Sequence, residues 1–149
     1  MKKTFQIFLS LLVIFCMYLV YNHFTYEFVH TGDMKDGNPI LSPMGDYSAQ
    51  IYYENYGGAA GGINVIVNII NHKKDNEEHT IYFSDAKGRV ALNWTAPDVL
   101  AITNVDEYEN RSVELVVEKE IYDELGRACN KYKVEKEYIC KDKNSSILY

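Results

Sequence analysis

The chain has 149 residues, 47% of them hydrophobic, which leaves room for one folded domain and excludes an intrinsically disordered protein. Two basic residues, Lys2 and Lys3, precede the first hydrophobic segment, and the rest of the chain has 13 Lys and Arg against 21 Asp and Glu, a net charge of −8. A surface this acidic repels nucleic acid, so we expect no nucleic-acid partner. The charge either serves solubility alone or favours a neutral or cationic partner.

An uncharged apolar segment of seventeen residues extends from Phe5 to Tyr21. At about 1.5 Å per residue, this segment and its flanking residues are long enough to cross a hydrocarbon core of about 30 Å. Because Lys2 and Lys3 precede it, the positive-inside rule places the N-terminus in the cytoplasm and the remainder outside. The sequence predicts a single-pass transmembrane anchor over residues 1–26 and a location in the cell membrane, with the C-terminal domain extracytoplasmic.

Two other interpretations of this segment are a cleaved signal peptide and a lipoprotein. Cleavage requires small residues after the apolar stretch, and none follows in the expected pattern. Lipidation would use Cys16, but Ile14 and Phe15 stand where small residues are favoured. An uncleaved anchor is therefore preferred, with Cys16 as an ordinary apolar residue of a membrane helix.

The exported part is predicted to be mainly β. Residues 27–39 are polar and rich in turn residues, so they are interpreted as a spacer before a domain over residues 40–149. Runs of β-branched and aromatic residues then alternate with Gly, Asn and Asp clusters. Strands are expected over residues 47–56, 63–70, 79–84, 90–94, 99–103 and 112–122. In the final segment, residues 127–140, residues 132–138 could form either a strand or a short charged helix. Six or so antiparallel strands would make a small sheet, a sandwich or a partly open barrel.

Two strands show which side chains share a face. Tyr52 and Tyr53 should place one ring on each side of their strand. In residues 63–70 the aliphatic side chains alternate with Asn64 and Asn68, which should point the opposite way. This alternation favours a strand over a helix, since β-branched residues dominate.

The stretch from Tyr56 to Gly62 is the most unusual part of the chain. Its glycines are the candidate ligand-binding residues: Gly57, Gly58, Gly61 and Gly62. Without side chains they would let a ligand approach the backbone, and their N–H groups could form an anion nest. The Gly-Lys-Ser/Thr sequence of a phosphate-binding loop is absent. The alternative is a flexible or bulged hairpin connection without a ligand.

No catalytic or metal-binding motif stands out, so we expect no catalytic residue, no metal and no cofactor. His72 and His79 bracket an acidic loop, but their spacing matches no established metal motif and is typical of surface histidines. The sequence contains none of the H-E-x-x-H, G-x-S-x-G or S-x-x-K motifs of hydrolases.

Cys129 and Cys140 are the two cysteines beyond the apolar segment, which makes them a candidate disulfide in an oxidising compartment. Along a straight strand they would lie over about 30 Å apart, so a bridge requires a turn or helix between them. Closing so short a loop would stabilise the domain by roughly 3 kcal/mol. The alternative is a buried Cys129 and a free Cys140.

Several segments together resemble a domain-of-unknown-function family of short exported or membrane-anchored proteins of Gram-positive bacteria. They are the apolar N-terminus, Leu41-Ser42-Pro43 with Gly45, and the stretches at residues 56–65, 80–87 and 110–129. The resemblance covers most of the chain after Pro39, and the glycine-rich stretch is its most specific part. It implies an envelope location and no established activity, and it transfers no catalytic residue.

These observations favour a non-catalytic envelope protein whose β domain binds another protein or a cell-wall component. An anchor, a spacer and an acidic, tyrosine-rich domain are present without reaction chemistry. One alternative is a small-ligand or ion sensor that uses the glycine-rich or the histidine loop. Another is a hydrolase with an unrecognised site.

Overall fold

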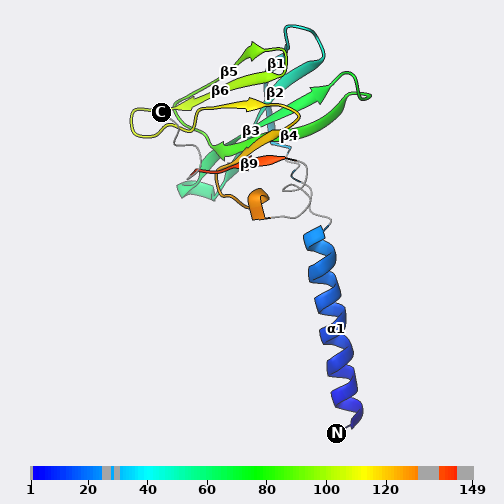
Figure 1. Cartoon of the computed structure of the whole chain (residues 1–149). Helices are drawn as coiled ribbons and strands as arrows, with labels where there is room; N and C mark the ends of the chain where they lie inside the picture. The colour runs from blue at the N-terminus through cyan, green and yellow to red at the C-terminus, as the bar shows by residue number, and fades with distance from the viewer. Residues whose placement is uncertain (1, 25–27, 29–30, 131–137, 144–149) are drawn as a thin grey trace.

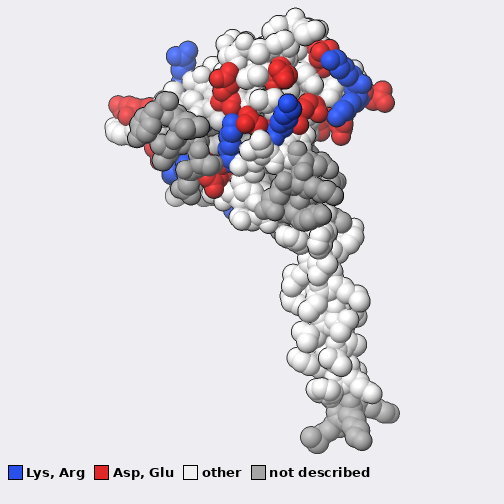
Figure 2. Space-filling model, in the orientation of Figure 1, with Lys and Arg blue, Asp and Glu red and all other residues white. Residues whose placement is uncertain are grey.

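The computed structural model describes residues 2–24, 28, 31–130 and 138–143. Helix α1 (Lys2–Phe24) stands apart from the β domain (Figure 1). Its part from Thr4 to Phe24 has a mean hydropathy of 2.1 and none of it is buried. Figure 2 shows the charged side chains on the β domain and none along the described side chains of the helix. The helix is thus long and apolar enough to be a membrane span or a signal sequence, as the sequence predicts.

The rest of the chain is mainly β, which confirms the predicted fold class. The described strands are β1 (Met34–Leu41), β2 (Tyr47–Tyr56), β3 (Gly62–Asn71), β4 (Glu77–Asp85), β5 (Arg89–Ala96), β6 (Val99–Val105), β7 (Val113–Val116), β8 (Glu120–Asp123) and β9 (Ile139–Lys141). One sheet has the order β1-β2-β3-β4-β8-β9 and the other β5-β6-β7. Of the three arrangements considered, the structure is a two-sheet sandwich (Figure 1).

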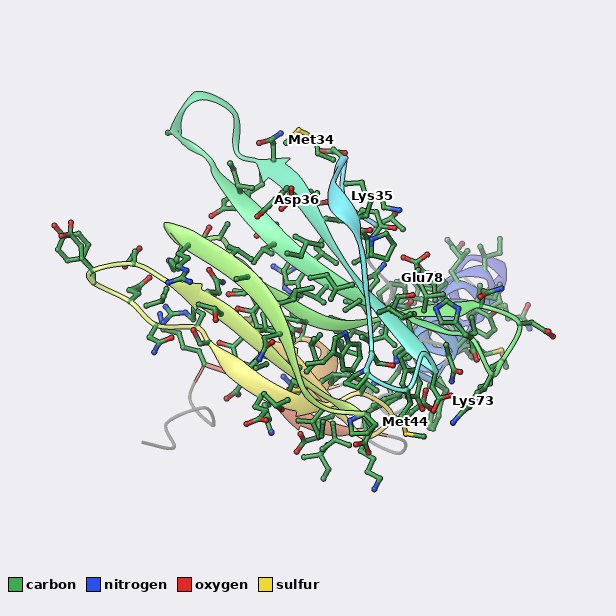
Figure 3. All side chains as sticks on the ribbon, turned by 90° about the horizontal axis from the view of Figure 1, so that it is seen from above. Met34, Lys35, Asp36, Met44, Lys73 and Glu78 are labelled. Carbon is green, nitrogen blue, oxygen red and sulfur yellow. A yellow bond between two sulfur atoms is a disulfide. The ribbon has the colours of Figure 1, made fainter. Side chains whose placement is uncertain are left out.

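The main core fills the space between the two sheets (Figure 3). Its buried members are Ala49, Ile51, Val65, Val67, Ile69, Ile81, Tyr82, Leu100, Ile102, Leu115, Val117 and Tyr122. On β3 the core residues are at alternate positions, because successive side chains of a strand point to opposite faces. We call this side of the six-stranded sheet its inner face.

The outer face of the six-stranded sheet carries a second, smaller core. Its buried members are Phe28, Ile66, Phe83, Ile121 and Ala128. Tyr52 packs against this outer core while Tyr53 packs against the inner one, so the two rings do lie on opposite faces. The middle of the large sheet is therefore covered on both sides.

The prediction of one long strand over residues 112–122 was wrong. A turn in which the Lys119 N–H donates to the Val116 carbonyl at 3.0 Å divides it into β7 and β8. Strand β7 pairs with β6, whereas β8 crosses to the other sheet and lies parallel to β4, with Tyr122 opposite Tyr82. Strand β9 is also parallel to β8, so the sheet is mixed and not purely antiparallel. The crossing buries Ile121 on the outer face and Tyr122 on the inner one.

Strand β1 begins at Met34, inside the segment that is interpreted as a spacer from its sequence. This strand pairs with β2 from Met34 opposite Tyr53, with an irregularity between Asp36 and Ile40. Every side chain of β1 is exposed, and Figure 3 shows Met34, Lys35 and Asp36 at the rim of the sheet. An exposed edge strand needs no apolar alternation, which is why its sequence resembles a spacer.

The last predicted segment, residues 127–140, contains a short 3₁₀ helix, η2 (Ala128–Asn130), and the start of β9. The sequence allowed a strand or a helix over residues 132–138, and all of these except Tyr138 lie outside the described residues.

Candidate functional site

A row of polar side chains crosses three strands at one end of the outer face. The register of the sheet places Glu54 on β2 opposite Asn64 on β3, and Asn64 opposite Asp85 on β4. The Asn64 amide donates to Glu54 Oε2 at 3.1 Å. One pair of positions further in, the matching row is Tyr52, Ile66 and Phe83. The outer face thus changes from apolar to polar within two residues along each strand.

Tyr56 covers the outer end of this polar row. Its ring lies across Gly62, where a Cβ would be only 2.5 Å from the tyrosine hydroxyl, so a larger residue would displace the ring. The hydroxyl donates to Asp85 Oδ1 at 3.0 Å, and this hydrogen bond raises the pKa of Tyr56. The glycine therefore allows an aromatic ring to reach over β3 to β4.

Glu124, just after β8, forms the opposite wall. One carboxylate oxygen accepts from Ser84 Oγ at 2.7 Å and from the Asp85 N–H at 2.8 Å, and the other accepts from Arg111 Nε at 2.9 Å. Burial alone would raise the pKa of Glu124, but the hydrogen bonds from Ser84 and Arg111 outweigh it and lower this pKa. Glu124 is therefore held as a carboxylate in a fixed position.

Lys87 and Arg111 extend this wall into an ion-pair network with Glu109. Lys87 Nζ lies 2.9 Å from Asp85 Oδ2 and 2.5 Å from Glu109 Oε2, and Arg111 Nη2 lies 2.9 Å from Glu109 Oε1. Hydrogen bonds from Lys87 and Arg111 lower the pKa of Glu109 to about 2. The two cations are thus shared among three carboxylates, Asp85, Glu109 and Glu124.

The buried Asn104 of β6 fixes the turn that carries Asp85 and Lys87. Its amide donates to the Asp85 carbonyl at 2.9 Å, and its side-chain oxygen accepts from the Lys87 N–H at 2.7 Å. Because Asn104 is on the other sheet, these bonds connect the polar row to the main body of the sandwich.

These groups border a cavity of about 640 Å³, which we call the polar cavity. Its lining residues are Glu54, Tyr56, Asn64, Phe83, Asp85, Glu124, Leu125 and Arg127. The volume is within the range of pockets that bind small molecules. Three carboxylates, one guanidinium, an amide, a phenol and two apolar side chains give it a polar lining with an apolar part.

The family described as "Family of unknown function (DUF5412)" matches residues 1–127. The chain belongs to this family. The match spans α1, every strand from β1 to β8 and all residues that line the polar cavity, and it bears out the resemblance to a family of unknown function. No curated protein and no solved structure matches the chain. The Gram-positive and exported character of the family stays a prediction.

In this DUF5412 member the glycine-rich stretch is the hairpin between β2 and β3. The backbone of Gly57 and Gly58 has positive φ, 77° and 62°, and a Cβ on Gly61 would lie 1.6 Å from the Tyr56 carbonyl oxygen. Backbone geometry thus accounts for these glycines without a ligand. Together with Gly62 they line a separate shallow depression of about 380 Å³, and their predicted ligand role stays untested.

The two histidines of the predicted acidic loop make different contacts. His72 Nε2 lies 2.6 Å from Ser48 Oγ, and its Nδ1 lies 2.7 Å from Asn76 Oδ1. His79 Nε2 lies 3.3 Å from the Val117 carbonyl. Within the described ranges, no three His, Cys, Asp or Glu residues are grouped as a metal site would require.

The structure joins Cys129 and Cys140 in a disulfide, with their Cα atoms 5.3 Å apart. Cys129 lies in η2 and Cys140 in β9, and Cys140 packs against the outer core. The bridge therefore closes the segment that follows β8 onto the sheet, next to Ala128.

Sequence reasoning missed the charged residues of the polar cavity: Glu54, Asp85, Glu124 and Arg127. One signal was present for the first of them. If the glycine-rich stretch is read as a hairpin centred on Ala59, Glu54 falls opposite Asn64, as observed. Asp85 and Glu124 depend on the β3–β4 register and on the parallel β4–β8 pair, which no local pattern indicates.

Proposed function

We propose that this protein is a non-catalytic binding module, anchored in a bacterial cell membrane by α1, with its β domain displayed on the extracytoplasmic side. The observation that carries the proposal is the polar cavity, in a domain joined to an exposed apolar helix. Its partner would be a protein or a cell-wall component of the envelope.

The anchor follows from the cost of exposing α1 to water. Twenty-one consecutive residues from Thr4 to Phe24 are uncharged and unburied, which far exceeds the apolar patch that a soluble monomer exposes. At about 1.5 Å per residue they match a hydrocarbon core of about 30 Å. Lys2 and Lys3 favour retention of the N-terminus in the cytoplasm.

The disulfide supports the extracytoplasmic placement of the domain. Cystines persist in oxidising compartments and are rare in the cytosol. Cys129 and Cys140 are bridged, and both Cys140 and Ala128, the neighbour of Cys129, pack in the outer core, so the bond is part of the fold.

The lining of the polar cavity favours binding over catalysis. None of its eight residues is a serine, threonine, cysteine, histidine or lysine, so its acid–base groups are three carboxylates and the phenol of Tyr56. Asp85 and Glu124 also receive hydrogen bonds on both carboxylate oxygens from groups of the protein itself. They are better placed to hold the walls than to transfer protons.

Cysteine labelling in intact cells tests the placement. In a Cys16→Ser background, Tyr108→Cys puts a thiol at a loop position where the tyrosine is 84% exposed, and Thr4→Cys puts one at the start of α1. A membrane-impermeant maleimide should label position 108 in intact cells and position 4 only after lysis. The reverse pattern would place the domain in the cytosol and end the proposal.

Site-specific crosslinking tests the binding role. A photoreactive residue in place of Leu125, which lines the polar cavity and is 58% exposed, should give a discrete product in growing cells. The same residue in place of Glu77, exposed at the start of β4 and outside the lining, is the control. Equal products at both positions, or none at 125, would contradict a binding role for the cavity.

A further inference from the structure

The charges of the polar cavity are not all balanced within the protein. Asp85 pairs with Lys87, and Glu124 pairs with Arg111. For the remaining two charged lining residues, Glu54 and Arg127, no ion pair occurs with any described residue. The cavity therefore presents one unpaired carboxylate and one unpaired guanidinium beside a wall whose charges are already paired.

These two residues come from opposite sides of the cavity. Glu54 is on β2 and Arg127 follows β8, and the sheet order puts β3 and β4 between them. Adjacent strands are about 4.8 Å apart, so β2 and β8 are separated by about 14 Å, part of which the two side chains span. The distance left between the two charged ends is on the scale of an amino acid or a short peptide, at about 3.5 Å per residue.

The lining between the two charges suits the body of such a ligand. Asn64 and Tyr56 offer an amide and a phenol, while Phe83 and Leu125 offer apolar surface. Glu54 accepts its one hydrogen bond from Asn64 on Oε2, and its other carboxylate oxygen has no described donor. That oxygen is available to a ligand ammonium group.

We propose that the polar cavity binds a small zwitterion of the amino-acid or short-peptide class. Glu54 holds the ammonium group, Arg127 holds the carboxylate, and Phe83 with Leu125 contacts the apolar part. This assignment rests on the proposed binding function and specifies its ligand class. It uses charge-assisted hydrogen bonds, the strongest that surface side chains make.

The test measures binding of alanine, dialanine and trialanine to the detergent-solubilised full chain by calorimetry at low salt. Three lengths are used so that the ligand can match the span between the two charges. N-acetyl-dialanine lacks the ammonium group and dialanine amide lacks the carboxylate. We expect the best zwitterion of the series to bind roughly tenfold to hundredfold more tightly than either blocked form, the usual effect of one charged hydrogen bond.

Two variants assign the ends of the ligand. Glu54→Gln should remove the preference for dialanine over N-acetyl-dialanine. Arg127→Gln should remove the preference for dialanine over dialanine amide. Glu77→Gln and Arg89→Gln change exposed charges that do not line the cavity, so they should leave both preferences intact. Thermal unfolding of each variant checks that it is folded.

Absence of binding by all three zwitterions at about 10 mM, or equal binding of the blocked forms, would overturn the zwitterion assignment. Tight binding of dialanine amide alone would show an amine site, and tight binding of N-acetyl-dialanine alone would show an anion site. Either result also overturns the zwitterion assignment. None of these results decides whether the domain has a binding function, which the labelling and crosslinking experiments test. A cytosolic domain, or the absence of a crosslink at position 125, is the separate result that removes the function itself.

Discussion

The two faces of the six-stranded sheet are built from the same strands and differ in what covers them. The inner face is mainly apolar and is covered by the three-stranded sheet. The outer face is apolar only in its middle, where Phe28 and Ala128 pack, and becomes polar and open at Glu54, Asn64 and Asp85. Since alternate residues of a strand supply the two faces, one stretch of sequence specifies both a core and a cavity.

This difference separates the residues that hold the fold from those available for a ligand. A buried apolar side chain stabilises the folded state because its surface is removed from water. A polar group at an open edge exchanges a hydrogen bond to water for one to the protein, so its net contribution to stability is small. Substitutions on the inner face should therefore cost the most stability, and substitutions on the open part of the outer face the least.

Truncation of the inner core should have the largest effect. Leu100 of β6 is completely buried between the sheets, so Leu100→Ala removes packed methyl groups and leaves a cavity. We expect the free energy of unfolding to fall by about 3 to 4 kcal/mol, measured by urea denaturation of the solubilised chain. The matched change on the exposed β1, Leu41→Ala, should cost under about 0.5 kcal/mol. Equal costs at the two positions would mean that the inner core is not the main support.

Loss of the disulfide should have the second largest effect on stability, and the destabilisation should be concentrated at the outer face. Cys129→Ser with Cys140→Ser, in a Cys16→Ser background, removes a bond that closes the segment after β8 onto the outer core. We expect a loss of about 2 to 3 kcal/mol. Hydrogen exchange should increase first around Ala128 and β9, while the amides of β6 stay protected. Uniform exchange throughout both sheets would contradict a local role for the bridge.

The same division explains how much the sequence reveals. Wherever one face is buried and the other is not, alternation marks the strand, so β2 and β3 were predicted to within a residue or so of their bounds. Alternation does not identify β1, because all of its side chains are exposed. It also does not reveal the short turn at Val117 to Lys119, because the alternating pattern continues through this turn. The polar cavity was missed because its lining comes from segments that register and a sheet crossing bring together.

Acid should weaken the ion-pair network beside the polar cavity. The pKa of Glu109 is lowered to about 2 by Lys87 and Arg111, and the pKa of Glu124 is also lowered. A lowered carboxyl pKa stabilises the folded state above the ordinary value of 4.5, and this stabilisation is lost as the pH falls from about 5 towards 2. Because Glu109 is exposed to solvent and salt screens it, we expect a smaller effect than that of the disulfide.

Urea midpoints between about pH 7 and pH 3 measure this loss. Glu109→Gln should be less stable at neutral pH and should show a shallower decline on acidification, while Glu77→Gln should follow the original chain. If Glu109→Gln declined as steeply as the original chain, the network would not be the source of the acid sensitivity.

The smallest effect is expected at Tyr56, on the open part of the outer face. Tyr56→Phe keeps the ring over Gly62 and removes only the hydroxyl that donates to Asp85 Oδ1. Because the tyrosine is 45% exposed, water can replace the lost donor, and the free energy of unfolding should fall by less than about 1 kcal/mol. Thermal and urea unfolding of the solubilised chain measure it, with Tyr82→Phe as the buried counterpart, whose hydroxyl joins Asn104 to the Arg111 carbonyl. A cost at Tyr56 as large as that at Tyr82 would show that the polar row is part of the structural support and not a surface left open for binding.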